Sequence, residues 1–121
     1  PGISRKVITV GALNESFSGC GPTECCIIKP EILAPGSNIT SLKNKKDEYI
    51  SKTGTSMATP FVTGSCAALM QWGIIEGNDA FLYGEKMKAA LINGARILPG
   101  EDSFPNPFYG WGALCLLDSI P

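Results

Sequence analysis

The stretch "SKTGTSMATPFV", residues 51–62, constrains the fold more than any other part of the chain. Gly54 permits a tight turn, and Pro60, which has no N–H to donate, fits a helix only near its first turn. The apolar and small residues that follow predict a helix over 57–72, which begins near Ser56 and is buried on every face. Residues 48–53 alternate in polarity and predict a strand just before the turn. The pattern predicts a strand, a sharp turn and a buried helix.

The other apolar runs are short and are separated by glycine and proline. A Val/Ile-rich run predicts a buried strand over 5–11, and the run between Pro30 and Pro35 predicts a second strand. We expect Gly73 to end the long helix as a C-cap. The remaining expected elements are a loop over 12–29, an extended piece over 37–40, a charged hairpin tip over 43–48, a helix over 83–95 with a solvent-side Glu85–Lys88 pair, a loop over 98–112 and a short helix over 113–119.

Composition narrows the class of protein. With 121 residues, 44% of them hydrophobic, 14 glycines and 9 prolines, the chain suits one turn-rich α/β domain or part of one. The net charge of −1 and the lack of a basic block argue against nucleic-acid binding. The longest apolar run is too punctuated to span a membrane. The sequence predicts a globular α/β chain with neither of these partners.

Cysteine usage argues against a disulfide framework and against a metal site. The count is odd, no histidine is present, and the spacing does not suit zinc. We expect buried free thiols instead. The five cysteines are Cys20, Cys25, Cys26, Cys66 and Cys115.

A hydroxyl at the start of a buried helix has two interpretations. The first N–H groups of a helix are unpaired and carry a partial positive charge, so Ser56 would lie beside donors that can stabilise an oxyanion. Gly54 and Ala58 are small and would let a substrate backbone approach. The alternative is that Thr55 or Ser56 only caps the helix, and local geometry alone favours this common role.

Five segments of the sequence, taken in order, favour the first of these interpretations. "GTSMATPFVTG" resembles the nucleophile signature of subtilisin-like serine proteases, and four other segments resemble motifs of the same family in the same order. The resemblance implies an α/β fold: residues 1–121 would be the C-terminal portion of a three-layer subtilisin-like domain, with a mostly parallel sheet and a buried nucleophile helix. The four other segments are "VITVGAL", "SFSGCGP", "KPEILAPGSNI" and "YGWGALCLLDSI".

The resemblance also implies roles for the residues of the signature. Ser56 would be the nucleophile, with its own backbone N–H as one oxyanion donor. Thr55 and Gly54 would support this site, and Met57 would pack behind the nucleophile. Phe61 stands where the family often has histidine, although not the catalytic one. The resemblance implies a protein or peptide as the substrate. Calcium sites are common in the family, but no ligand cluster in this sequence supports one, so we expect no cofactor or metal.

The chain lacks a base for Ser56, because it contains no histidine. In the family the chain order is Asp, His, Ser, so the Asp, the His and the oxyanion Asn would lie upstream of the residues seen here. We therefore expect 1–121 to be inactive alone and to self-associate through surfaces left bare. A Ser–Lys dyad with Lys52, or a glutamate base from an upstream segment, is a weaker alternative.

Three functional hypotheses remain. The first is the catalytic C-terminal segment of an active endopeptidase, and the second is a noncatalytic relative that only binds partners. Residues 71–100 resemble a subgroup from anaerobic spore-forming bacteria, which includes germination proteases and noncatalytic paralogues. The third is an unrelated α/β binding domain with a capped helix. The family resemblance implies a secreted or spore-associated protein, while the odd cysteine count leaves an intracellular location open.

Overall fold

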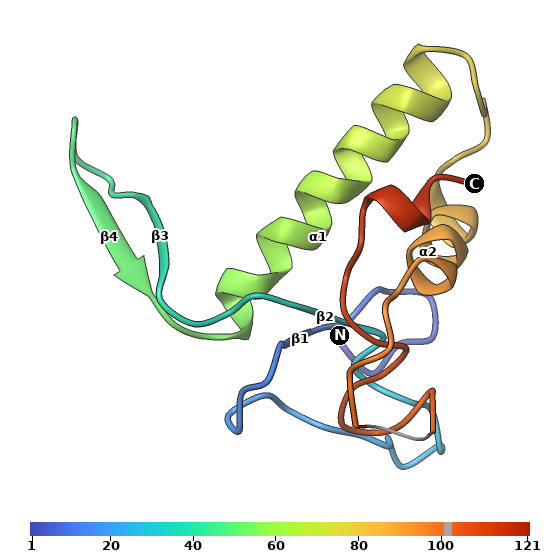
Figure 1. The fold of residues 1–121 in the computed structure, drawn as a ribbon, viewed down its shortest axis with the longest axis horizontal. Coiled ribbons are helices and arrows are strands. Elements are labelled where there is room, and N and C mark those ends of the chain that lie inside the picture. The colour runs from blue at the N-terminus through green and yellow to red at the C-terminus, as the bar shows by residue number, and fades with distance from the viewer. Residues whose placement is uncertain (101–102) are drawn as a thin grey trace.

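The structure, a computed structural model, describes residues 1–100 and 103–121. Residues 101–102, which belong to the expected loop over 98–112, lie outside the described residues. Figure 1 shows a long helix that crosses a small sheet, with a hairpin at one side and a second helix at the other. The elements are β1 (Val10–Ala12), β2 (Ile32–Ala34), β3 (Ile39–Leu42), β4 (Tyr49–Lys52), α1 (Thr55–Met70), the π-helix η1 (Gln71–Ile75), α2 (Gly84–Asn93) and the 3-10 turn η2 (Leu117–Ser119).

Parallel pairing dominates the sheet in the body of the molecule. β1 and β2 are parallel, and Leu33 continues the sheet through a parallel bridge to Ala113. Ala113 also bridges Arg96, in an antiparallel direction. The expected α/β class with a mostly parallel sheet is confirmed. The strand expected over 5–11 is reduced to 10–12, because the segment before Thr9 bonds to side chains rather than to a neighbouring strand.

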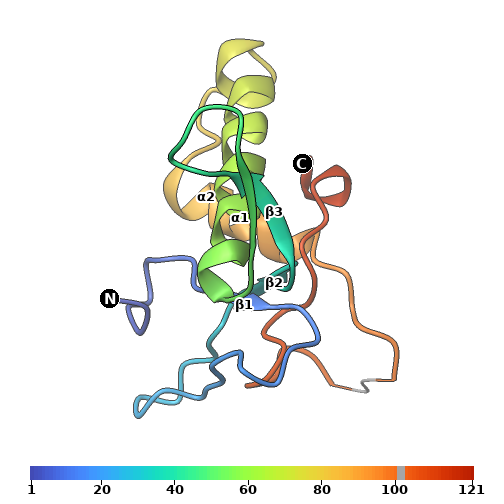
Figure 2. The same ribbon diagram turned by 90° about the vertical axis from the view of Figure 1, so that its left-hand side faces the viewer.

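The helix α1 follows β4 after one turn and packs on β1 and β2. Figure 2 shows the whole length of α1, with the hairpin in front of it. Its buried side chains form a single stripe at the helical spacing. The expectation that every face is buried is wrong, since Phe61 on another face is 42% exposed. Within the described residues, only one side of the helix has elements packed against it. The stripe consists of Ala58, Val62, Ser65 and Leu69.

The long helix does not end at Gly73 as expected. It continues without a break into η1, and Gly73 is buried within that π-helical turn. The carbonyl of Gln71 accepts the amide of Glu76, which is the i to i+5 pattern of a π-helix. The carbonyl of Gly73 in turn accepts the amide of Asp79 at 2.9 Å, so the chain turns back after the helix. Gly73 therefore lies inside the π-helix rather than at its end, where Glu76 is the C-cap.

The helix α2 matches its predicted range closely and buries its predicted stripe, Met87, Ala90 and Leu91. Lys88 does not form the expected solvent-side pair with Glu85, since its ammonium contacts Glu31 at 2.5 Å. The helix expected over 113–119 is wrong: Ala113 belongs to the sheet, and only the turn η2 is helical.

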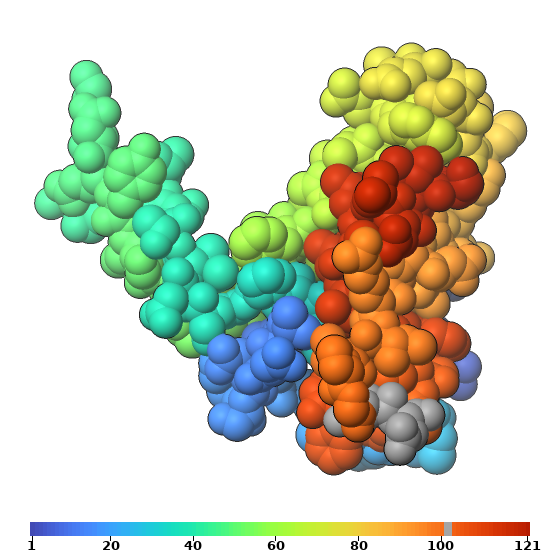
Figure 3. All heavy atoms as spheres, in the orientation of Figure 1, coloured from blue at the N-terminus to red at the C-terminus, as the bar shows by residue number. Residues whose placement is uncertain are grey.

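The antiparallel hairpin β3–β4 stands apart from the body of the molecule (Figure 3). All four residues of β4 are exposed, and so are three of the four in β3. Lys43 and Glu48 close the expected charged tip with a 2.7 Å ion pair. Among the described residues, no helix has the length and apolar character needed to cross a membrane.

Candidate active site

The turn before α1 depends on Gly54. Its backbone has φ 152° and ψ 162°, a region that is essentially restricted to glycine. Its amide donates to the carbonyl of Gly36 at 2.8 Å, and its carbonyl accepts the amide of Met57 at 2.9 Å. Gly54 is the N-cap of α1, and the helix has no side-chain cap. Neither Thr55 nor Ser56 therefore acts as the cap that local geometry alone favoured.

Ser56 is the second residue of α1 and is exposed. It lines a hollow of about 360 Å³ between β3 and the first turn of the helix. Within residues 1–100 and 103–121, the structure gives its hydroxyl no hydrogen-bond partner. A nucleophile at this position is open to a base that approaches through the hollow. The other lining residues are Ile39, Thr40, Ser41, Met57, Pro60 and Phe61.

Lys52 does not form a dyad with Ser56. It is an exposed residue at the end of β4, where it pairs with Ile39 across the hairpin. In the described part of the chain, no hydrogen bond joins its ammonium to the serine hydroxyl. No carboxylate of that part bonds to Ser56 either. Within residues 1–100 and 103–121, the structure therefore shows no base bonded to Ser56.

Thr55 and Met57 lie on either side of Ser56. Met57 is half-buried and lines the same hollow as Ser56. Thr55 is half-buried and lines a second hollow of about 420 Å³, to which the N-terminal residues Gly2 and Ile3 also contribute. The carbonyl of Thr55 accepts the hydroxyl of Thr59. The signature residues thus line two hollows: Thr55 lines the second, and Ser56 and Met57 line the first.

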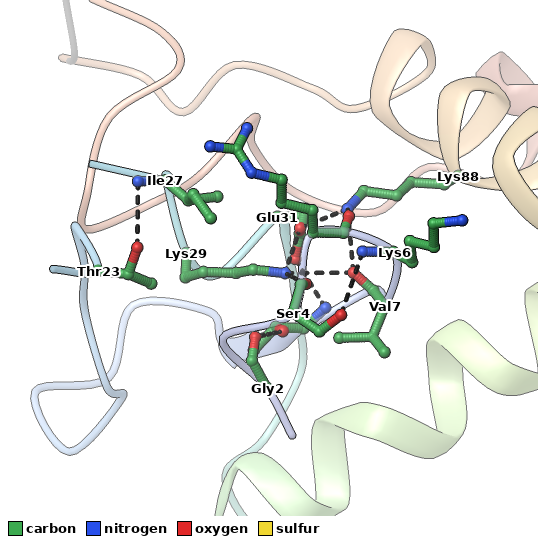
Figure 4. A network of polar contacts seen from close by, with 11 residues as sticks. Gly2, Ser4, Lys6, Val7, Thr23, Ile27, Lys29, Glu31 and Lys88 are labelled. Atoms are coloured by element: carbon green, nitrogen blue, oxygen red, sulfur yellow. Dashed lines mark hydrogen bonds and ion pairs between the residues drawn. The ribbon is translucent and has the colours of Figure 1, made fainter. Parts of the chain in front are cut away.

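A buried charge cluster, drawn in Figure 4, includes Lys29, which also lines the second hollow. One carboxylate oxygen of Glu31 contacts the ammonium groups of Lys29 and Lys88, each at 2.5 Å. Its other oxygen accepts the amide of Thr9 at 2.7 Å. Burial raises the pKa of Glu31, but the hydrogen bonds from the two lysines and from Thr9 outweigh it and leave that pKa lowered.

Sequence reasoning missed this cluster. Lys29 and Glu31 are close in the sequence, but both would have been assigned to the surface by residue type. They are only 6% and 3% exposed. Lys88 approaches from α2, 57 positions after Glu31, and no local pattern reports such a contact. The single available signal was a charged pair bracketing Pro30 at the start of an apolar strand.

The expectation of buried thiols is wrong for the loop over 12–29. Cys20, Cys25 and Cys26 are exposed, because this loop is polar and lies on the surface. Cys66 and Cys115 are half-buried, and burial raises the pKa of the Cys66 thiol. Among the described residues, no three His, Cys, Asp or Glu side chains group closely enough to hold a metal ion.

Comparison with known proteins finds relatives across the whole chain. The chain is 37% identical to Serine protease AprX of Bacillus subtilis, over all of this chain and 31% of that protein. It is similar to the solved CspB protease of Clostridium perfringens, with a TM-score of 0.92 and 42% identity over 99% of this chain and 27% of that one. It is also similar to the prenylagaramide maturation protease PagA, with a TM-score of 0.79 and 31% identity.

PagA is matched over 43% of its chain. The chain thus spans less than half the length of each of these three relatives. A sequence model of the Subtilase family, Peptidase_S8, matches residues 1–112. With this match, and with relatives of more than 30% identity over nearly all its length, the chain belongs to the subtilase family of serine proteases.

Proposed function

We propose that this chain supplies the nucleophile of a subtilase-type serine endopeptidase, with Ser56 as the attacking residue. The observation that carries the proposal is the placement of Ser56 in the first turn of α1, directly after the Gly54 turn and facing an open hollow. The family relationship supports a protein or peptide as the substrate.

The chain's own atoms suit two parts of such a reaction. The hydroxyl oxygen of Ser56 would attack the scissile carbonyl carbon and form an acyl-enzyme, while its proton passes to a base and then to the leaving amine. The amide of Ser56 belongs to the first helical turn, and it donates to no acceptor among the described residues. That amide is the donor we assign to the developing oxyanion.

The base, its orienting acid and a second oxyanion donor would come from sequence outside residues 1–121. The chain contains no histidine, and no described side chain bonds to the hydroxyl of Ser56. We infer that an upstream Asp, His and Asn complete the site. We expect the base to enter through the hollow lined by Ile39, Met57 and Phe61, because Ser56 lines this hollow.

Activity-based labelling tests this proposal. The pure chain, treated with a serine-directed fluorophosphonate and with a peptide amide substrate, should show neither labelling nor hydrolysis. Mixed with a polypeptide that carries the N-terminal part of a subtilase domain, it should become labelled at Ser56. The variant Ser56→Ala is the matched control and should stay unlabelled in the mixture.

Two results would contradict the proposal in different ways. Robust labelling of the chain alone at Ser56 would show that its own residues supply a base. A stable complex with the N-terminal part that binds substrate and is never labelled would favour a noncatalytic, partner-binding relative instead.

A further inference from the structure

Residues 1–7, called the N-terminal strap below, are held to the rest of the molecule mainly by the ammonium groups of two lysines. All seven residues are exposed. Apart from one bond between Thr9 and the carbonyl of Gly2, the hydrogen bonds that the structure shows from the described strap to other residues all run to two ammonium groups. Lys29 donates to the carbonyls of Ser4 and Val7, and Lys88 donates to those of Arg5 and Val7.

One carboxylate holds both ammonium groups in place. Each lysine nitrogen lies 2.5 Å from the same oxygen of Glu31, so the two nitrogens are at most about 5 Å apart and would repel each other strongly without it. Each ammonium has three hydrogens, and the two strap carbonyls together with Glu31 use all three. The cluster is therefore complete, and Glu31 is its central group.

The strap forms part of the wall beside the candidate nucleophile. Gly2 and Ile3 line the second hollow together with Thr55, the residue directly before Ser56, and with Cys20 from the loop over 12–29. Lys29 and Thr9 line the same hollow. Displacement of the strap would remove one wall of this hollow while leaving β1, β2 and α1 in place.

We propose that Glu31 is a positioning residue for the candidate active site: through Lys29 and Lys88 it fixes the strap as one wall of the hollow beside Thr55. In this role Glu31 touches no substrate. The inference rests on the proposed function only in so far as the hollow receives part of a substrate. Its attachment and its geometry can be tested without any catalytic step.

Limited digestion with trypsin measures the attachment. The exposed hairpin tip offers cleavage after Lys45 and Lys46 as an internal standard, and the strap offers cleavage after Arg5 and Lys6. Glu31→Gln should raise strap cleavage relative to tip cleavage by about tenfold, because the strap opens locally. Lys88→Met should act in the same direction. Lys86→Met is the matched control, since Lys86 lies on the same helix but pairs with Asp79.

Thiol labelling measures the wall. A thiol introduced by Val10→Cys, at a half-buried position that lines the same hollow, should react several-fold faster with a bulky maleimide when Glu31→Gln is added, relative to the exposed Cys25 in the same molecule, because the hollow has opened. Unchanged strap cleavage in both variants would overturn the proposal. A parallel rise in cleavage after Arg96, or a loss of helical circular dichroism, would also overturn it, because the cluster would then support the whole fold rather than the strap.

Discussion

Gly54 donates its amide to the carbonyl oxygen of Gly36 at 2.8 Å, and this bond ties the turn before the candidate nucleophile to the loop after β2. Gly36 in turn lies so close to Ala12 of β1 that an added Cβ would meet the Cβ of Ala12 at 2.7 Å. The start of α1 is thereby fixed against the end of the parallel pair. The position of Ser56 is a consequence of these close backbone approaches.

Replacing Gly54 by alanine should destabilise the chain by about 1–3 kcal/mol, because its φ of 152° is strained for any residue with a Cβ. Gly64→Ala is the matched control on the same helix. Gly64 has nothing within 4 Å of an added Cβ, so this change should raise stability by about 0.5–1 kcal/mol. Urea unfolding of both variants measures the contrast, and equal effects would contradict the role of the Gly54 turn.

Stability should fall in acid because of Glu31. Its pKa is lowered in the folded chain below the ordinary value of 4.5, so its stabilising contribution is fully present above that pH. The contribution is lost as the pH falls through the folded pKa. Urea unfolding at a series of pH values should show this loss in the wild type.

The variant Glu31→Gln should be less stable to urea at neutral pH by no more than about 1–2 kcal/mol, because local opening of the strap relieves the two ammonium groups that lose their charge partner. Its stability should also depend less on acid. Glu48→Gln at the hairpin tip is the control, because its ion pair with Lys43 is exposed and should contribute little. An acid dependence that survives Glu31→Gln unchanged would assign it to other groups.

Four of the five thiols should react in two groups. Cys20, Cys25 and Cys26 are exposed and should label rapidly with iodoacetamide in the native chain. Cys66 should label slowly, because it is half-buried and its pKa is raised by burial, which leaves little thiolate. Peptide mass spectrometry after short exposure measures both groups, and labelling of Cys66 at the rate of Cys20 would contradict the packing of α1.

The two faces of α1 should respond differently to substitution. Leu69→Ala removes a side chain that is 1% exposed and should cost about 2–5 kcal/mol of stability. Phe61→Ser changes an exposed position and should leave stability within about 0.5 kcal/mol.

Light scattering should show self-association of the wild type that Phe61→Ser weakens, because large exposed apolar patches associate. A wild type that is monomeric at micromolar concentration would contradict this prediction.

Local patterns predicted the elements whose signals are contained in a few residues. The Gly54 turn, the start of α1 and the buried stripe of α2 follow from turn chemistry and helical spacing, and the structure has them close to the predicted positions. The C-terminal region was predicted wrongly because Ala113 is recruited into the sheet by Leu33 and Arg96, which lie far away in the sequence.

The candidate site also has a part that the sequence could predict and a part that it could not. The signature around Ser56 is contiguous, so the sequence could locate the residue and its neighbours. The second hollow could not be predicted, since it brings together Gly2, Cys20 and Thr55 from three separate segments. The prediction buried too much of α1. An apolar side chain indicates that a residue can be buried, but it does not show that another part of the described chain covers it.

The single buried stripe of α1 also determines what a mutational screen of this chain would record. A selection for folding of residues 1–121 will accept polar replacements at Phe61 and Met70 and reject them at Val62 and Leu69. A selection for peptide hydrolysis in a longer protein would restrict both sets. The difference between the two tolerance maps would identify, residue by residue, any surface that covers the exposed side of α1 in the longer protein.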